Sequence, residues 1–216
     1  MASGFPGSID NFTDPLSNSS LSSPSHAGQH ADLNDAVEKI ETYMGLVKVI
    51  PTGATNGTVT ADGDVTIGNA VSSVTVSGAF SSLYDNYRIV ISGGAASTNA
   101  SMTMILGATT TGYYDLGIYS QMGVGTVLSY NNANAASWAS IVYSTANNLY
   151  GTIELRDAYN AKNTMFESVA IQSNTSGFIN RAAGYLANTT SYTAFTLTAT
   201  AGTVTGGTIR VYGYRN

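Results

Sequence analysis

The sequence predicts a mainly β protein with an extended N-terminal arm, one short coiled-coil-like helix, a short β neck and a C-terminal, jelly-roll-like β-sandwich. From Pro51 onward, short alternating runs of β-branched residues are separated by Gly, Asn and Thr turns. A single apolar repeat of three- and four-residue spacings precedes them. The first thirty residues have no apolar period. The expected segments are therefore an arm over 1–31, a helix over 32–45, a neck over 46–79 and a sandwich over 80–216.

The first thirty residues contain too little apolar surface to fold alone. Pro6, Pro15 and Pro24 are separated by Ser, Asn and Gly. Such a segment cannot offset the entropy lost when it becomes ordered. We expect it to order against a partner surface, and the alternative is a tail with incidental apolar residues. The candidate anchoring side chains are Phe5, Ile9, Phe12, Leu16 and Leu21.

A helix is predicted from Asp32, which serves as its N-cap, to a stop at Gly45, with Asp35 in the first turn. A helix of about 13 residues is marginal in water, so its apolar stripe must be covered. Either its own domain or identical copies of the helix can cover it, and two heptads do not fix the number of copies. The candidate interface residues, spaced four, three, four and three apart, are Leu33, Val37, Ile40, Met44 and Val47.

The remainder of the chain is predicted to be strands. Residues 57–67 read as a hairpin that turns at Asp62-Gly63. No fixed repeat appears, which argues against a β-helix or a propeller. The boundary of the terminal domain is expected near residues 70 to 80. Further strands are expected at 74–77, 87–92, 101–106, 137–143, 151–155, 166–171, 181–185, 194–198 and 208–212.

Composition excludes several classes of function. Only 10% of the residues are charged, against about 25% in ordinary domains. The net charge is -5 with no basic cluster, so nucleic-acid binding is not expected. There is neither a run of about 18 apolar residues nor a secretory leader, so neither membrane insertion nor export is expected. The absence of Cys excludes disulfides and cysteine nucleophiles.

No catalytic residue and no cofactor are expected. The two histidines, His26 and His30, precede the β region, which excludes a histidine-based triad there, and no nucleophile elbow or phosphate loop is present. Glu154, Asp157 and Glu167 are near enough in sequence for glycoside hydrolysis. Residues 155–160 nevertheless read more simply as a strand end followed by an Asp/Asn turn. We therefore expect a protein that is not an enzyme.

A metal site is not expected either. His26 and His30 would bind a metal only if copies of the chain brought several imidazoles together, and the simpler alternative is hydrogen bonding near the start of the helix. Asp62 and Asp64 resemble the start of a calcium loop, but no bidentate Glu follows. The hairpin turn explains them better.

The aromatic residues predict a recognition surface. The chain has 14 Tyr, and Tyr offers a flat apolar ring and a hydroxyl at low entropic cost. Between Arg88 and Glu154 the only ionisable acid or base is Asp115. Such a neutral surface suits hydrogen bonding to glycans or to a repetitive protein lattice, although several Tyr must belong to the core. The candidate receptor surface is Tyr113, Tyr114, Tyr119, Tyr130 and Tyr159.

Particular stretches of the chain resemble tailed-bacteriophage virion proteins of the tail-fibre or surface-appendage type. The N-terminal resemblance covers about 40 residues, in Phe5-Pro-Gly-Ser-Ile-Asp-Asn-Phe-Thr-Asp-Pro15, Ser23-Pro-Ser-His26 and Gln29-His30-Ala-Asp-Leu-Asn34-Asp-Ala-Val-Glu-Lys-Ile-Glu41. Two later stretches are similar to the terminal β domain of such proteins: Phe80-Ser-Ser-Leu-Tyr-Asp-Asn-Tyr-Arg-Ile-Val-Ile91 and Gly206-Gly-Thr-Ile-Arg-Val-Tyr-Gly-Tyr-Arg215.

The resemblance implies a homotrimer on the virion surface, made in the cytoplasm of a bacterial host. Its arm would anchor to other phage structural proteins, and its β domain would point outward. We expect a short trimeric tail fibre or receptor-binding protein that attaches to a host surface glycan. The alternative is a capsid decoration, or cement, protein that stabilises the head lattice. Adhesion needs a site at the far tip, whereas cementing needs a large interface at the base.

Overall fold

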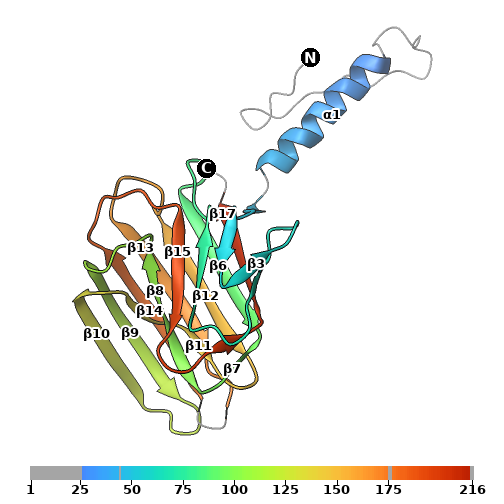
Figure 1. The fold of residues 1–216 in the computed structure, drawn as a ribbon. Coiled ribbons are helices and arrows are strands. Elements are labelled where there is room, and N and C mark those ends of the chain that lie inside the picture. The colour runs from blue at the N-terminus through green and yellow to red at the C-terminus, as the bar shows by residue number, and fades with distance from the viewer. Residues whose placement is uncertain (1–25, 44, 175–176, 215–216) are drawn as a thin grey trace. The chain divides into compact units, whose positions relative to one another are not determined.

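The computed structural model describes residues 26–43, 45–174 and 177–214. They fall into two compact units, Met1–Gly45 and Leu46–Asn216. The described part of the first unit is one helix, and the second unit is made of strands (Figure 1). The fold is mainly β, as the sequence predicts.

The helix of the first unit, α1, spans His26–Tyr43 and begins six residues before the predicted start. Asp32 therefore lies inside the helix, and the predictions that it is the N-cap and that Asp35 lies in the first turn are wrong. Residues 26–31 contain no Pro, and Gly28 alone costs only about 1 kcal/mol of helix propensity. The predicted stop is confirmed, since Gly45 has a φ of 62°.

The predicted helical stripe is only partly helical. Leu33, Val37 and Ile40 lie on one face of α1 and are 54%, 45% and 42% exposed. Met44 lies outside the described residues, as do the arm residues 1–25 with all five candidate anchoring side chains. Val47 does not belong to the stripe, because it lies in a strand and pairs with Gly213. Of the five candidate interface residues, three therefore lie exposed on the described helix.

The second unit contains seventeen strands in its described residues. They are β1 (Leu46–Lys48), β2 (Gly53–Thr55), β3 (Gly57–Val59), β4 (Val65–Ile67), β5 (Ser73–Ser77), β6 (Asn86–Gly93), β7 (Ala95–Ala96), β8 (Ala100–Leu106), β9 (Tyr113–Gln121), β10 (Val127–Ala135), β11 (Trp138–Ser144), β12 (Leu149–Arg156), β13 (Thr164–Ile171), β14 (Phe178–Leu186), β15 (Ala194–Ala199), β16 (Val204–Thr205) and β17 (Thr208–Tyr214).

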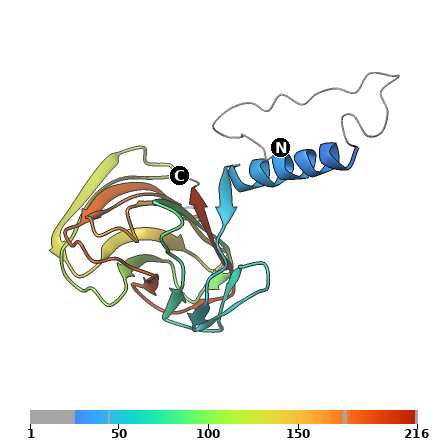
Figure 2. The same cartoon turned by 90° about the horizontal axis from the view of Figure 1, so that it is seen from above.

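Fifteen of these strands form one antiparallel sheet, and β7 pairs with β16 separately. The main path is β10-β9-β14-β13-β12-β11-β8-β15-β5-β2. Strand β12 is the branch point, because it also pairs with β6 along its full length. Strand β6 pairs with β17, and β17 pairs with β1 and β4. Seen from above, the strands curve around a common interior (Figure 2).

The core is built by side chains that alternate between buried and exposed along most of the strands, and β11 departs from this alternation. In β6, Tyr87, Ile89 and Ile91 are fully buried, while the residues between them are partly exposed. The largest buried side chain is that of Trp138 on β11, whose ring lies 4.5 Å from that of Phe166 on β13 (centroid to centroid). The Trp138 ring also contacts that of Tyr113 on β9, so strands that are not paired with each other share one apolar core.

The predicted neck is not a separate segment. Strands β1 and β4 pair with β17, and β5 pairs with β15. Val65, Val74 and Val76 are fully buried in the same core as the C-terminal strands. The expected domain boundary near residues 70 to 80 is therefore wrong, and the unit begins at Leu46. The predicted hairpin is confirmed, with β3 paired to β4 and Gly63 at a φ of 80°.

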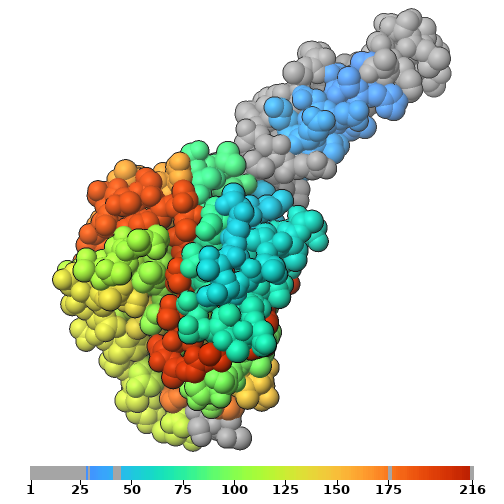
Figure 3. Space-filling view, in the orientation of Figure 1, coloured from blue at the N-terminus to red at the C-terminus, as the bar shows by residue number. Residues whose placement is uncertain are grey.

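Two long strands, β9 and β10, are absent from the strands that the sequence predicts. Several of their residues are Asn, Ser, Asp or Gly, which are typical of turns. Tyr130 lies opposite Gly117, and a Cβ on Gly117 would lie 2.2 Å from the Tyr130 ring. The glycine therefore makes room for the ring. The β9–β10 hairpin forms one flank of the unit, opposite the flank built by residues 46–80 (Figure 3).

Trp138→Ala should destabilise the second unit strongly, because it removes a fully buried ring that contacts both Tyr113 and Phe166. We expect a loss of about 3–5 kcal/mol in the free energy of unfolding, measured by denaturant titration. Leu83→Ala is the control, since Leu83 is 70% exposed and its truncation should cost less than about 0.5 kcal/mol. If the two variants were equally stable, the packing of Trp138 in the core would be contradicted.

Candidate functional site

The candidate site lies on the outer face, which we define as the side of β17, β6, β12, β13, β14 and β9 that points away from the core. The antiparallel register aligns side chains across these strands in rows. One row runs through Tyr212, Arg88, Glu154, Glu167, Ala183 and Leu116. The next runs through Arg210, Val90, Thr152, Val169, Arg181 and Ile118.

The parts of these two rows that lie on β12, β13, β14 and β9, together with Arg88 of β6, line an open groove of about 530 Å³. Its aliphatic lining includes Leu116 and Ile118, which are 58% and 51% exposed. Its charged lining consists of Arg88, Glu154, Glu167 and Arg181. A concave, partly apolar surface with a few placed polar groups is the usual form of a ligand site.

Glu154 holds two neighbours in fixed positions on the groove. Arg88 on β6 donates from Nε to Glu154 Oε1 over 2.5 Å, and the Tyr214 hydroxyl donates to Glu154 Oε2 over 2.7 Å. The Arg88 guanidinium also lies 5.9 Å from the centre of the Tyr214 ring, within cation–π range. The hydrogen bond to Glu154 raises the pKa of Arg88, and burial followed by the same carboxylate raises the pKa of Tyr214.

The second carboxylate of the groove is paired as well. Glu167 lies directly opposite Glu154 in the β12–β13 ladder, where two like charges would repel each other. Arg156 relieves this repulsion, with its Nη1 3.0 Å from Glu167 Oε1. Arg181 is different, because it forms no ion pair or hydrogen bond with any residue in the described part of the chain. One cation of the groove is thus left for an external partner.

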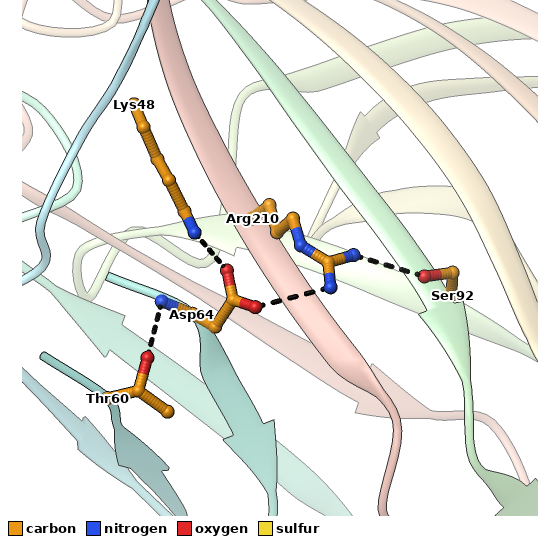
Figure 4. Close-up of polar contacts among 5 residues, drawn as sticks. All are labelled: Lys48, Thr60, Asp64, Ser92 and Arg210. Atoms are coloured by element: carbon orange, nitrogen blue, oxygen red, sulfur yellow. Dashed lines mark hydrogen bonds and ion pairs between the residues drawn. The ribbon is translucent and has the colours of Figure 1, made fainter. Parts of the chain in front are cut away.

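A second ion cluster joins the first strand of the unit to its last (Figure 4). Asp64 pairs with Lys48 of β1 and, over 3.2 Å, with Arg210 of β17. Its backbone N–H donates to Thr60 Oγ1 over 3.1 Å, which fixes the hairpin turn. The hydrogen bond from Lys48, assisted by the Arg210 charge, lowers the pKa of Asp64 despite partial burial.

The three carboxylates considered for hydrolysis do not converge. Glu154 and Glu167 share the groove, but each is held by an arginine. Asp157 lies in the following turn, where it contacts Asn160 and Lys162. In residues 26–43, 45–174 and 177–214, no three acidic or histidine side chains gather in a way that could hold a metal ion. His26 and His30 lie one turn apart on α1.

The five candidate receptor tyrosines do not form one surface. Tyr113 is fully buried, and its hydroxyl accepts from Leu106 N and donates to Thr109 O; burial raises its pKa to about 12. Its assignment to a receptor surface is therefore wrong. Tyr119 and Tyr130 are half-buried neighbours, and Tyr159 packs on the core. Only Tyr114 lies on the outer face, stacked on Tyr185 with ring centres 4.9 Å apart.

The sequence predictions missed the charged groove. Its signal was present in the alternation along the strands, since Glu154 and Arg156 share one side of a strand whose other side is apolar. What the sequence could not supply was the register that places them beside Arg88 and Glu167. Within the part of the chain that the structure describes, no helix is both long and apolar enough to cross a membrane. Comparisons with protein families, curated proteins and solved structures found no match to this chain.

Asp64→Asn should destabilise the second unit by about 1 kcal/mol near neutral pH, because it removes the partner of two partly exposed cations. The pKa of Asp64 lies below 3.8 in the folded state, so its contribution is complete above the unfolded pKa and is lost as the pH falls through the folded value. Urea unfolding from pH 7 to pH 2.5 should therefore show the stability difference shrinking below about pH 4.

The matched control is Asp62→Asn, two residues away in the same turn. Asp62 is exposed and forms no ion pair with the described residues. Its substitution should leave the stability and its pH dependence nearly unchanged. The same pH dependence in both variants would contradict the role assigned to Asp64.

Proposed function

We propose that this chain is a structural protein of a tailed-bacteriophage virion, a short trimeric tail fibre or receptor-binding protein that attaches to a glycan on the host surface. The observation that carries the proposal is the groove on the outer face, in which ion pairs hold Arg88, Glu154 and Glu167 in place without an external ligand. Preorganised polar side chains beside an apolar lining suit recognition. The sequence resemblance to phage appendage proteins supplies the setting.

Within this proposal, the second unit is a jelly-roll-like β-sandwich. The antiparallel pairing and the contacts of β11 with β9 and β13 across one core support that architecture. The chain would then present two differently built parts: a helix whose apolar residues need sister copies, and a self-sufficient β unit. It would act by binding rather than by turnover, since the arginines that neutralise Glu154 and Glu167 leave neither free as an acid or base.

Capsid decoration is the second candidate. The outer face also exposes Met165 and Ile179 by 50% and 48%, so a larger aliphatic surface surrounds the groove. Such a surface fits a protein lattice as well as it fits a ligand. Binding to host cells separates the two functions, because cementing of the head lattice does not require it.

Replacing Val37 and Ile40 together by Asp should convert a trimer into monomers. Both side chains are exposed on one face of α1, and two carboxylates in a threefold apolar seam would repel each other. Analytical ultracentrifugation of the full chain measures the result. The control places two Asp residues at Ala31 and Asn34, which are exposed outside this row, and should remain trimeric. If the double variant sedimented with the mass of a trimer, the proposal that α1 forms the trimer interface would be wrong.

The purified full chain should compete with the phage for attachment sites on host cells. We expect the rate of phage adsorption to fall by at least about tenfold when the chain saturates these sites. A heat-unfolded sample at the same concentration is the control. Unchanged adsorption together with antibody labelling of the head would reject the adhesin and favour capsid decoration.

A further inference from the structure

The outer face is the cationic region of an acidic protein. The whole chain has a net charge of -5, yet this face and its ion clusters carry five cations against three carboxylates. The cations are Lys48, Arg88, Arg156, Arg181 and Arg210, and the carboxylates are Asp64, Glu154 and Glu167. A local charge opposite to that of the whole chain attracts an anionic partner to this face.

The strands β5, β15 and β8, which do not belong to the outer face, have a different chemistry. They present hydroxyls, as in the 2.8 Å contact between Thr75 Oγ1 and Thr196 Oγ1. Thr103 and Thr198 continue this pattern in the paired strands β8 and β15. An anionic ligand therefore has one preferred face.

Arg181 is the side chain in the groove that is free to take the anion. It is exposed on β14, between Val169 of β13 and Ile118 of β9 in the register. Its guanidinium forms no ion pair or hydrogen bond with the described residues, in contrast to Arg88 and Arg156. A guanidinium matches a carboxylate through two parallel N–H···O bonds.

The rest of the lining suits a sugar. The carboxylates of Glu154 and Glu167 have lone pairs that remain available to hydroxyl donors, and Arg88 and Arg156 keep them in place. Leu116, Ile118 and Ala183 offer apolar contact for the C–H face of a ring. A volume of about 530 Å³ falls in the range of small-ligand sites. A polyphosphate fits less well, because it would meet two carboxylates.

We propose that this groove binds an oligosaccharide that carries a carboxylate, with the acid group paired to Arg181 and neighbouring hydroxyls bonded to Glu154 and Glu167. The proposal rests on the proposed attachment to a host glycan and names the class of that glycan. It also moves the receptor site from the tyrosines predicted from the sequence to the β12–β14 part of the outer face.

The test uses the full chain and purified surface polysaccharide of the host, either intact or with its carboxylates reduced to alcohols. Biolayer interferometry measures the affinity of the wild type, Arg181→Gln and Lys162→Gln. Lys162 is the matched control, because its ammonium is exposed, lies outside the groove and carries the same charge. Circular dichroism melting verifies that each variant is folded.

We expect the intact polysaccharide to bind, and we expect both carboxylate reduction and Arg181→Gln to weaken binding by at least about tenfold. Lys162→Gln should bind as the wild type does. If the intact and reduced polysaccharides bound equally well, or if Arg181→Gln bound as the wild type does, the groove would not recognise a carboxylate. Attachment to a glycan would still be supported. No binding of either polysaccharide by the wild type would instead reject the proposed function.

A second variant separates a ligand groove from an interface between subunits. Leu116→Glu changes an exposed residue of the same lining. It should leave the sedimentation mass unchanged if the groove is open to a ligand. A fall in mass would show that a sister subunit covers this face, which would overturn the proposal.

Discussion

The antiparallel register around β12 is the constraint on which the rest of this structure depends. Strand β12 pairs with β6 over its whole length and with β13 over most of it. Because side chains alternate along each strand, this pairing sends Ile153 and Leu155 into the core and Glu154 to the outer face. A slip of one residue would bury Glu154 and expose the core, so packing and the groove are specified together.

The same register brings several of the few charged side chains of this protein together on the outer face. Glu154 and Glu167 lie directly opposite each other, an arrangement that is unfavourable without nearby cations. Arg88 on one side and Arg156 on the other neutralise them. Each ion pair is partly exposed and contributes little to stability, but together they fix the positions of four polar side chains. Their main effect is therefore on the shape and chemistry of the groove.

Much of the fold could be predicted from the sequence, because strands such as 86–93 and 208–214 alternate cleanly between apolar and polar residues. Strands β9 and β10 could not, since their Gly, Asn, Asp and Ser residues are typical of turns and their stability comes from tertiary contacts such as Tyr130 over Gly117. The helix start was misplaced because Asp32 fits an N-cap as well as a helix interior. The groove was missed because it depends on pairing between residues that are distant in the chain, such as Arg88 and Glu154, which are 66 positions apart and lie in the adjacent strands β6 and β12.

Hydroxyl-radical footprinting of the full chain, with and without host surface polysaccharide, is the most direct measure of whether the groove binds the polysaccharide. Leu116, Ile118 and Met165 are exposed around the groove, and Leu83 and Met122 are exposed elsewhere. If the groove is the binding site, the polysaccharide lowers the oxidation of the first three residues and leaves that of the other two unchanged. Protection limited to Leu83 or Met122, or equally low oxidation of the groove residues before any polysaccharide is added, would contradict it.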